Sequence, residues 1–137
     1  MDPKLLNKLL KIRQGNATWQ CTLRRAPIWI FPKKQSAYRP FILLVVDQDS
    51  GTIIKTEIEE KRPDPRAVLA HLFDAMPGSI LTMGQKHRPA RICIDDAELV
   101  QFCAPQMAEV NVRVELRASL PELSQALYEF RNNHEPT

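Results

Sequence analysis

Apolar residues recur at helical spacing at the start of the chain. Leucines fill one side of residues 5–10, and lysines lie on the other side. Asp2 can cap such a helix, Pro3 suits its first turn, and Gly15 provides a stop. The pattern predicts an N-terminal helix within residues 1–15, whose apolar stripe packs on its own domain or docks a partner.

The following part of the chain has the pattern of three strands. Apolar and polar residues alternate over 19–24, and an apolar run resumes at 28–31. Residues 41–46 are apolar on both faces, which is typical of a strand inside a covered sheet. The stretch 47–51 has hairpin-turn composition, so residues 52–58 should return as the antiparallel partner.

Helices and strands alternate in the second half of the chain. The expected elements are a helix over 65–76, a strand over 90–94, a helix over 97–107 with a kink or break at Pro105, a strand over 110–116, and a helix capped by Ser119. This order predicts an α/β fold with a mixed five-stranded sheet. We expect a single domain over 16–131 after the N-terminal helix, and a frayed tail over 132–137.

Composition narrows the class of protein only modestly. The chain has 137 residues, of which 44% are hydrophobic and 26% charged, as in an ordinary globular domain. A formal net charge of +3 permits nucleic-acid binding without requiring it. Three cysteines with no CxxC pair indicate neither a zinc site nor a disulfide framework, and reduced thiols favour the cytoplasm. No signal peptide or membrane-spanning run is evident.

Several short segments resemble a known fold. The stretches 19–22, 47–54 and 91–96 are similar to the first strand, the second hairpin and the fourth strand of retroviral-type integrase cores. The span 19–116 also resembles an uncharacterised bacterial domain family of unknown function, through the Tyr-Arg-Pro at 38–40, the aspartate–glycine hairpin, and an Arg-Pro-x-Arg strand that ends in acidic residues. The resemblance implies a ribonuclease H-like βββαβαβα fold with an extra N-terminal helix.

The same resemblance implies an incomplete catalytic centre. Ribonuclease H-like enzymes hold two divalent metals with acidic side chains from adjacent strands and a late helix. The fourth-strand aspartate corresponds to Asp95, the one candidate metal ligand, but the first-strand acid falls at or next to Thr22. The late-helix acid has no clear match, since Glu122 and Glu129 are the only carboxylates on that helix. Without the resemblance, either Asp95 or Asp96 is expected to cap the next helix, and the pair is best interpreted as a cap together with a first-turn carboxylate.

Basic residues offer a second set of candidates, for nucleic-acid binding. Arg24 and Arg25 follow the first strand, whereas Lys86, Arg88 and Arg91 precede the fourth. In a ribonuclease H-like sheet these strands are parallel neighbours, so the two groups should lie at opposite ends and form no common patch.

Two aromatic residues could take part in nucleic-acid binding. Trp29 and Phe31 could stack on bases, but their apolar run favours the core.

The sequence therefore favours a non-catalytic binding or assembly module, with no cofactor and with a protein partner or self-association. One alternative is a nuclease or phosphoryl-transfer enzyme that uses Mg²⁺ or Mn²⁺ and a relocated carboxylate set, Asp95, Asp96 and Glu122. The other is a nucleic-acid-binding module, and neither the charge nor the motifs exclude it.

Overall fold

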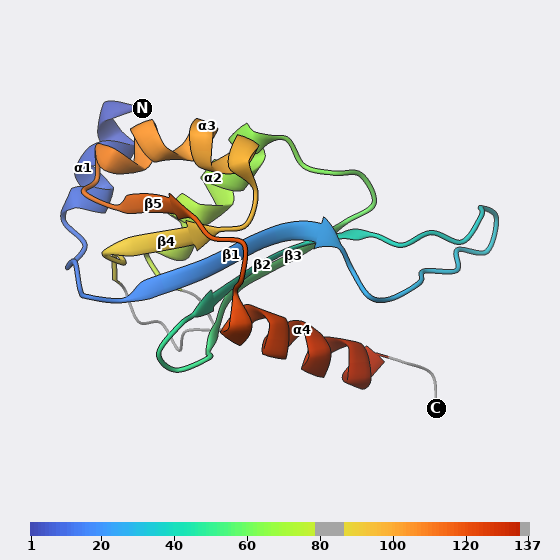
Figure 1. Cartoon of the computed structure of the whole chain (residues 1–137). Helices are drawn as coiled ribbons and strands as arrows, with labels where there is room; N and C mark the ends of the chain where they lie inside the picture. The colour runs from blue at the N-terminus through green and yellow to red at the C-terminus, as the bar shows by residue number, and fades with distance from the viewer. Residues whose placement is uncertain (79–86, 135–137) are drawn as a thin grey trace.

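The computed structural model describes residues 1–78 and 87–134. Its core is a mixed five-stranded sheet with strand order β3-β2-β1-β4-β5 (Figure 1). In chain order the elements are α1 (Pro3–Leu10), β1 (Thr18–Arg25), β2 (Phe41–Asp47), β3 (Ile53–Glu59), α2 (Pro65–Ala75), β4 (Arg91–Ile94), α3 (Ala97–Ala108), β5 (Arg113–Leu116) and α4 (Pro121–His134). The predicted order of helices and strands is confirmed.

β1 lies in the middle of the sheet and joins its two halves. It pairs antiparallel with β2, in the register Trp19↔Asp47, and parallel with β4, in the register Cys21↔Ile94. The β2–β3 hairpin turns at Gly51, whose φ of 72° is readily adopted only by a residue without a side chain. The parallel pair places the C-terminal ends of β1 and β4 at the same end of the sheet, where Asp95 lies.

The helices cover the two faces of the sheet unequally. Figure 1 shows α1, α2 and α3 on one side and α4 on the other. Because side chains alternate along a strand, Trp19, Cys21 and Leu23 of β1 enter the larger core beneath the three helices. Gln20 and Thr22 point toward the α4 face, where a smaller apolar cluster lies.

The buried Arg88 fixes α1 to this core. Its Nε donates to the carbonyl of Ile12 at 2.9 Å, and its Nη1 donates to the carbonyl of Val110. Leu9 and Ile12 pack in the larger core, so the apolar stripe of the first helix is used within its own domain, as its pattern favoured. Arg88 thus joins the end of α1 to the turn that follows α3.

The prediction that Trp29 and Phe31 are core residues is wrong. Residues 26–40, here called the arm, leave the sheet between β1 and β2 and project from the body of the molecule (Figure 1). Trp29 is 60% exposed and Phe31 is 77% exposed. Pro27 and Pro32 have no N–H for a strand ladder, which explains why this apolar run is not a sheet strand.

Other boundaries also differ from prediction. The expected strand over 110–116 is shortened to β5, because residues 110–112 form the turn that ends α3, with Asn111 at a φ of 62°. α3 continues through Pro105 without a break. α4 begins at Pro121, so Leu120 rather than Ser119 precedes it. It runs to His134, beyond the residue where the frayed tail was expected to begin.

We expect Arg88→Met to lower the free energy of unfolding by roughly 2–4 kcal/mol, because it leaves two carbonyl oxygens without their charged donor. Urea unfolding followed by circular dichroism measures the loss. Arg66→Met, at an exposed position on α2, is the matched control and should change stability by less than about 0.5 kcal/mol. Equal effects of the two substitutions would contradict the role assigned to Arg88.

Candidate functional site

Asp95 lies at the end of β4 and is held by two residues of β1. The hydroxyl of Thr22 donates to the Asp95 carboxylate, with its Oγ1 2.9 Å from each oxygen. Arg24 Nη2 donates to Asp95 Oδ2 at 2.7 Å, and Arg24 Nε donates to Thr22 Oγ1 at 3.0 Å. The parallel pairing of the two strands brings these side chains together, and the three form a closed polar triad.

Asp96 has different partners from its neighbour. Its Oδ1 accepts the Leu99 N–H at 3.1 Å and caps α3, as the local sequence predicts. Its Oδ2 accepts a hydrogen bond from Arg62 Nη2 at 2.9 Å. Asp96 therefore stabilises the start of a helix and forms an ion pair with the segment before α2.

Glu122, in the first turn of α4, contacts the sheet at Gln20, away from Asp95 and Asp96. The buried Gln20 of β1 donates from Nε2 to Glu122 Oε2 at 2.5 Å, and its Oε1 accepts the N–H of Leu123 at 3.0 Å. A side chain from the sheet thereby supplies the acceptor that the first turn of α4 needs. Gln20 was absent from the sequence-based candidates, although a glutamine within a covered strand is a signal that could have identified it.

The three candidate carboxylates thus have separate partners. Among the residues that the structure describes, no group of three or more His, Cys, Asp or Glu side chains is placed to hold a metal ion. The residues beside Asp95 also do not fit a divalent cation, which requires several oxygen ligands. A guanidinium lies 2.7 Å from the Asp95 carboxylate instead and supplies a positive charge from the chain itself.

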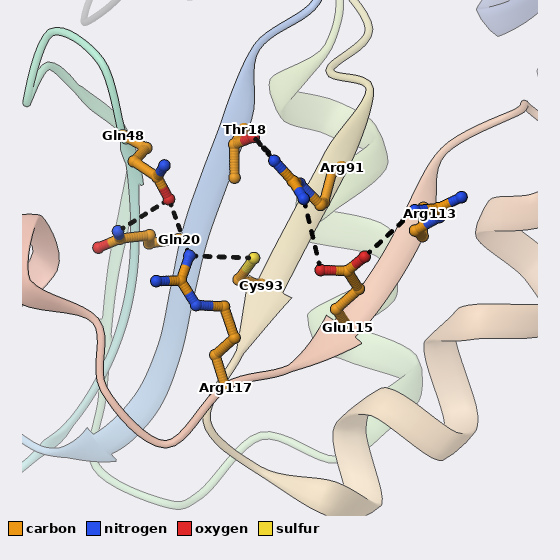
Figure 2. A network of polar contacts seen from close by, with 8 residues as sticks. All are labelled: Thr18, Gln20, Gln48, Arg91, Cys93, Arg113, Glu115 and Arg117. Carbon is orange, nitrogen blue, oxygen red and sulfur yellow. Dashed lines mark hydrogen bonds and ion pairs between the residues drawn. The ribbon is translucent and has the colours of Figure 1, made fainter.

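A second polar network crosses the α4 face of the sheet toward its β5 edge (Figure 2). Arg117 Nη1 donates to Gln48 Oε1 at 3.0 Å and contacts Cys93 Sγ at 3.7 Å, and Gln48 in turn accepts from Gln20 Nε2 at 3.2 Å. This network links the β2–β3 turn to the residue after β5. Sequence patterns do not predict this network, because its members lie far apart along the chain.

The basic candidates do not share a surface. Arg24 and Arg25 lie at the end of β1, where the guanidinium of Arg25 is 4.3 Å from the centre of the Phe41 ring. Arg91 lies opposite Thr18 at the other end, donates to the Thr18 hydroxyl at 3.2 Å and forms an ion pair with Glu115 at 3.7 Å.

Arg88 and Lys86 are the remaining two basic candidates. Arg88 is buried, so its guanidinium is not on the surface. Lys86 lies outside the described residues.

The three thiols are free and buried. Burial raises the pKa of Cys21 strongly, and the nearby Cys103 and Asp95 raise it further. Burial also raises the pKa of Cys103 from 9.0 to about 11. Both thiols stay protonated near neutral pH, so neither has the thiolate that a cysteine nucleophile requires.

Comparison with solved structures identifies the class of fold. The chain is similar to a chain of the simian T-cell lymphotropic virus intasome in complex with PP2A regulatory subunit B56 gamma, at 21% identity and a TM-score of 0.52, over 89% of this chain and 40% of that one. It is also similar to the catalytic core domain of BIV integrase, at 14% identity and a TM-score of 0.45, over 87% of this chain and 66% of the other. The sheet and its helices thus have the ribonuclease H-like fold of retroviral integrase cores, as expected.

A family model then gives the narrower assignment. The model of a domain of unknown function, DUF6930, matches residues 5–131, and the chain belongs to this family. The chain spans less than two thirds of the length of the two integrase chains. No curated protein matches it. None of the helices in the described part of the chain combines the length and the hydrophobicity needed to cross a lipid bilayer.

We expect Asp95→Asn and Arg24→Gln each to lower the free energy of unfolding by about 1 kcal/mol, because each removes one member of a charge-assisted contact. The Arg24 side chain is 43% exposed, so solvent screening limits the coupling energy to about 0.5–1 kcal/mol. A double-mutant cycle by urea unfolding measures that coupling. Additive losses would show that the pair contributes nothing to stability.

The raised pKa of Cys103 predicts a stability that depends on pH. Between pH 9 and about 11 the unfolded state releases this thiol proton while the folded state retains it, so the free energy of unfolding should fall as the pH rises through that range. Urea midpoints of the wild type and of Cys103→Val, measured at both ends of the range, isolate the effect. The wild type should lose more stability than the variant, and parallel losses would contradict the assignment.

Proposed function

We propose that this chain is a non-catalytic binding or assembly module on a ribonuclease H-like scaffold. The observation that carries this proposal is the ion pair of Arg24 with Asp95, closed by Thr22. Two-metal chemistry needs carboxylates that converge on one point. Here the candidate that corresponds to a metal ligand is neutralised by a cation from the same strand that should have carried a second acid.

The proposal includes the absence of a metal cofactor. Asp96 and Glu122, the remaining members of the relocated carboxylate set, are bound to Arg62 and to Gln20. Bringing Asp96 to Asp95 would break a helix cap, and bringing Glu122 there would break its hydrogen bond with Gln20. The alternative of a nuclease or phosphoryl-transfer enzyme therefore requires a rearrangement of three separate contacts.

A reconstruction experiment tests the proposal directly. The wild type should show no Mn²⁺-dependent thermal shift and no cleavage of labelled single- or double-stranded oligonucleotides. The double variant Thr22→Asp/Arg24→Gln replaces the triad with two facing carboxylates, so Mn²⁺ should raise its melting temperature. The matched control, Thr22→Asn/Arg24→Gln, has the same shape without the second charge and should not respond.

Two other outcomes would count against the proposed function. Cleavage by the wild type with Mn²⁺ that is lost in Asp95→Ala would contradict a non-catalytic role. Salt-sensitive oligonucleotide binding without cleavage, reduced by Arg25→Gln, would favour the nucleic-acid-binding alternative.

The environment and partner belong to the same proposal. Three buried, unpaired thiols suit a reducing compartment, which supports a cytoplasmic location. The partner is a protein, either another chain or a second copy of this one. The exposed aromatic side chains of the arm support this choice, because large apolar groups left in water commonly mark contact surfaces.

A further inference from the structure

The arm has the composition of a contact surface. From Ala26 to Pro40 it contains no carboxylate, and its basic residues are Lys33, Lys34 and Arg39. Trp29 and Phe31 lie two residues apart in an extended segment and are both mostly exposed, while Ile28 packs against the smaller core. Alternation therefore places two aromatic rings on the outer side of the arm, close to two lysines at its apex.

The backbone of the arm has a free edge. Ile30 and Tyr38 exchange two hydrogen bonds, at 2.8 and 3.0 Å, which makes the arm a short hairpin. The N–H and C=O groups of the residues on either side of Ile30 point to the opposite edge. The N–H groups of Trp29 and Phe31 donate no hydrogen bond within the described chain. The arm thus presents unpaired backbone donors beside its exposed aromatic rings.

The complementary surface lies at the root of the arm. β3 is an edge strand, and within the described residues its outer side has no neighbour. Glu59 at its end pairs with Phe41, the residue that directly follows the arm. Glu59 and Glu60 form no ion pair within the described chain, and the adjacent Ile58 is an exposed apolar side chain. Lys61 follows the two glutamates, Arg62 is paired with Asp96, and the guanidinium of Arg25 lies over the Phe41 ring, so the carboxylates of Glu59 and Glu60 remain open to a partner.

We propose that the arm binds the β3 edge of a second copy of this chain, which makes the protein a two-fold dimer. Lys33 and Lys34 would meet Glu59 and Glu60 of the other copy, and the aromatic rings would cover its Ile58. The free N–H groups of Trp29 and Phe31 would donate to carbonyl groups along its β3 edge. The arm and the end of β3 that carries Glu59 lie at the same end of the molecule, so a two-fold axis satisfies both contacts at once and closes at two copies. The inference rests on the proposed function and names its partner.

The arm fits this partner better than it fits a membrane. In a segment that inserts into a bilayer, apolar residues lead and basic residues remain at the interface. Here the order is reversed, because Lys33, Lys34, Gln35 and Ser36 form the apex and the aromatic residues lie behind it. A sheet edge, by contrast, uses the free backbone and the aromatic pair together.

Charge exchange provides the decisive experiment. Sedimentation velocity of the wild type over a wide concentration range should show a dimer, whereas Lys33→Glu/Lys34→Glu and Glu59→Lys/Glu60→Lys should each be monomeric because like charges then face each other. An equimolar mixture of the two variants should restore the dimer, since both contacts of the mixed pair are complementary. Nickel capture of one tagged variant would retain the other.

The aromatic pair is tested in parallel. Trp29→Ala/Phe31→Ala should weaken dimerisation at least tenfold, as expected for central aromatic contacts. Tyr128→Ala, an exposed aromatic residue on α4, is the control and should dimerise like the wild type. A cooperative thermal unfolding transition of the monomeric variants shows that they remain folded. Because Trp19 is buried, a blue shift of tryptophan emission on dimerisation reports on Trp29.

Several outcomes would overturn the dimer. A wild type that stays monomeric up to the highest concentration would do so, as would a dimer that survives loss of the aromatic pair. Failure of the mixed variants to associate would exclude the charge pairing. Binding of the arm to oligonucleotides or to anionic vesicles by a monomeric wild type would reassign it to those partners. None of these results depends on metal binding or cleavage, so the non-catalytic assignment is tested separately.

Discussion

The parallel pairing of β1 with β4 is the constraint on which this structure depends. It aligns the ends of two strands that are distant in the sequence, and it thereby decides that Asp95 meets Thr22 and Arg24. In a metal-dependent enzyme of this fold, the same alignment would concentrate negative charge that only a cation from solution can offset. In this chain the guanidinium of Arg24 lies 2.7 Å from the Asp95 carboxylate and supplies a compensating positive charge.

The two faces of the sheet are held by different kinds of interaction. The face beneath α1, α2 and α3 is a continuous apolar core. Beside it, the buried Arg88 donates hydrogen bonds to the carbonyls of Ile12 and Val110. On the α4 face a smaller apolar cluster is supplemented by hydrogen bonds from Gln20 and Arg117. Such polar networks are directional, so they fix the position of a helix more narrowly than apolar contact alone.

Sequence patterns predicted the parts of this structure that depend on local periodicity. The alternation in β1, the cap at Asp96 and the turn at Gly51 each depend on residues close together in the sequence. The resemblance to integrase strands identified Asp95 and showed that Thr22 stands where a second acid is expected. The exposure of Trp29 and Phe31 could not be predicted, because an apolar run does not reveal whether anything covers it. The partner of Gln20 was equally hidden, since it lies 102 residues away along the chain.

The position of β1 also determines when the sheet can be completed. Its antiparallel partner β2 and the next strand, β3, follow it after the arm, but the strand on its other side, β4, begins only at Arg91. During synthesis a three-stranded meander can therefore form early, with β1 as one of its edge strands and its apolar face uncovered. Pairing across such a sequence separation is slow. Until the second half of the chain has emerged, β1, the central strand of the finished sheet, is therefore an edge strand that can pair with another chain.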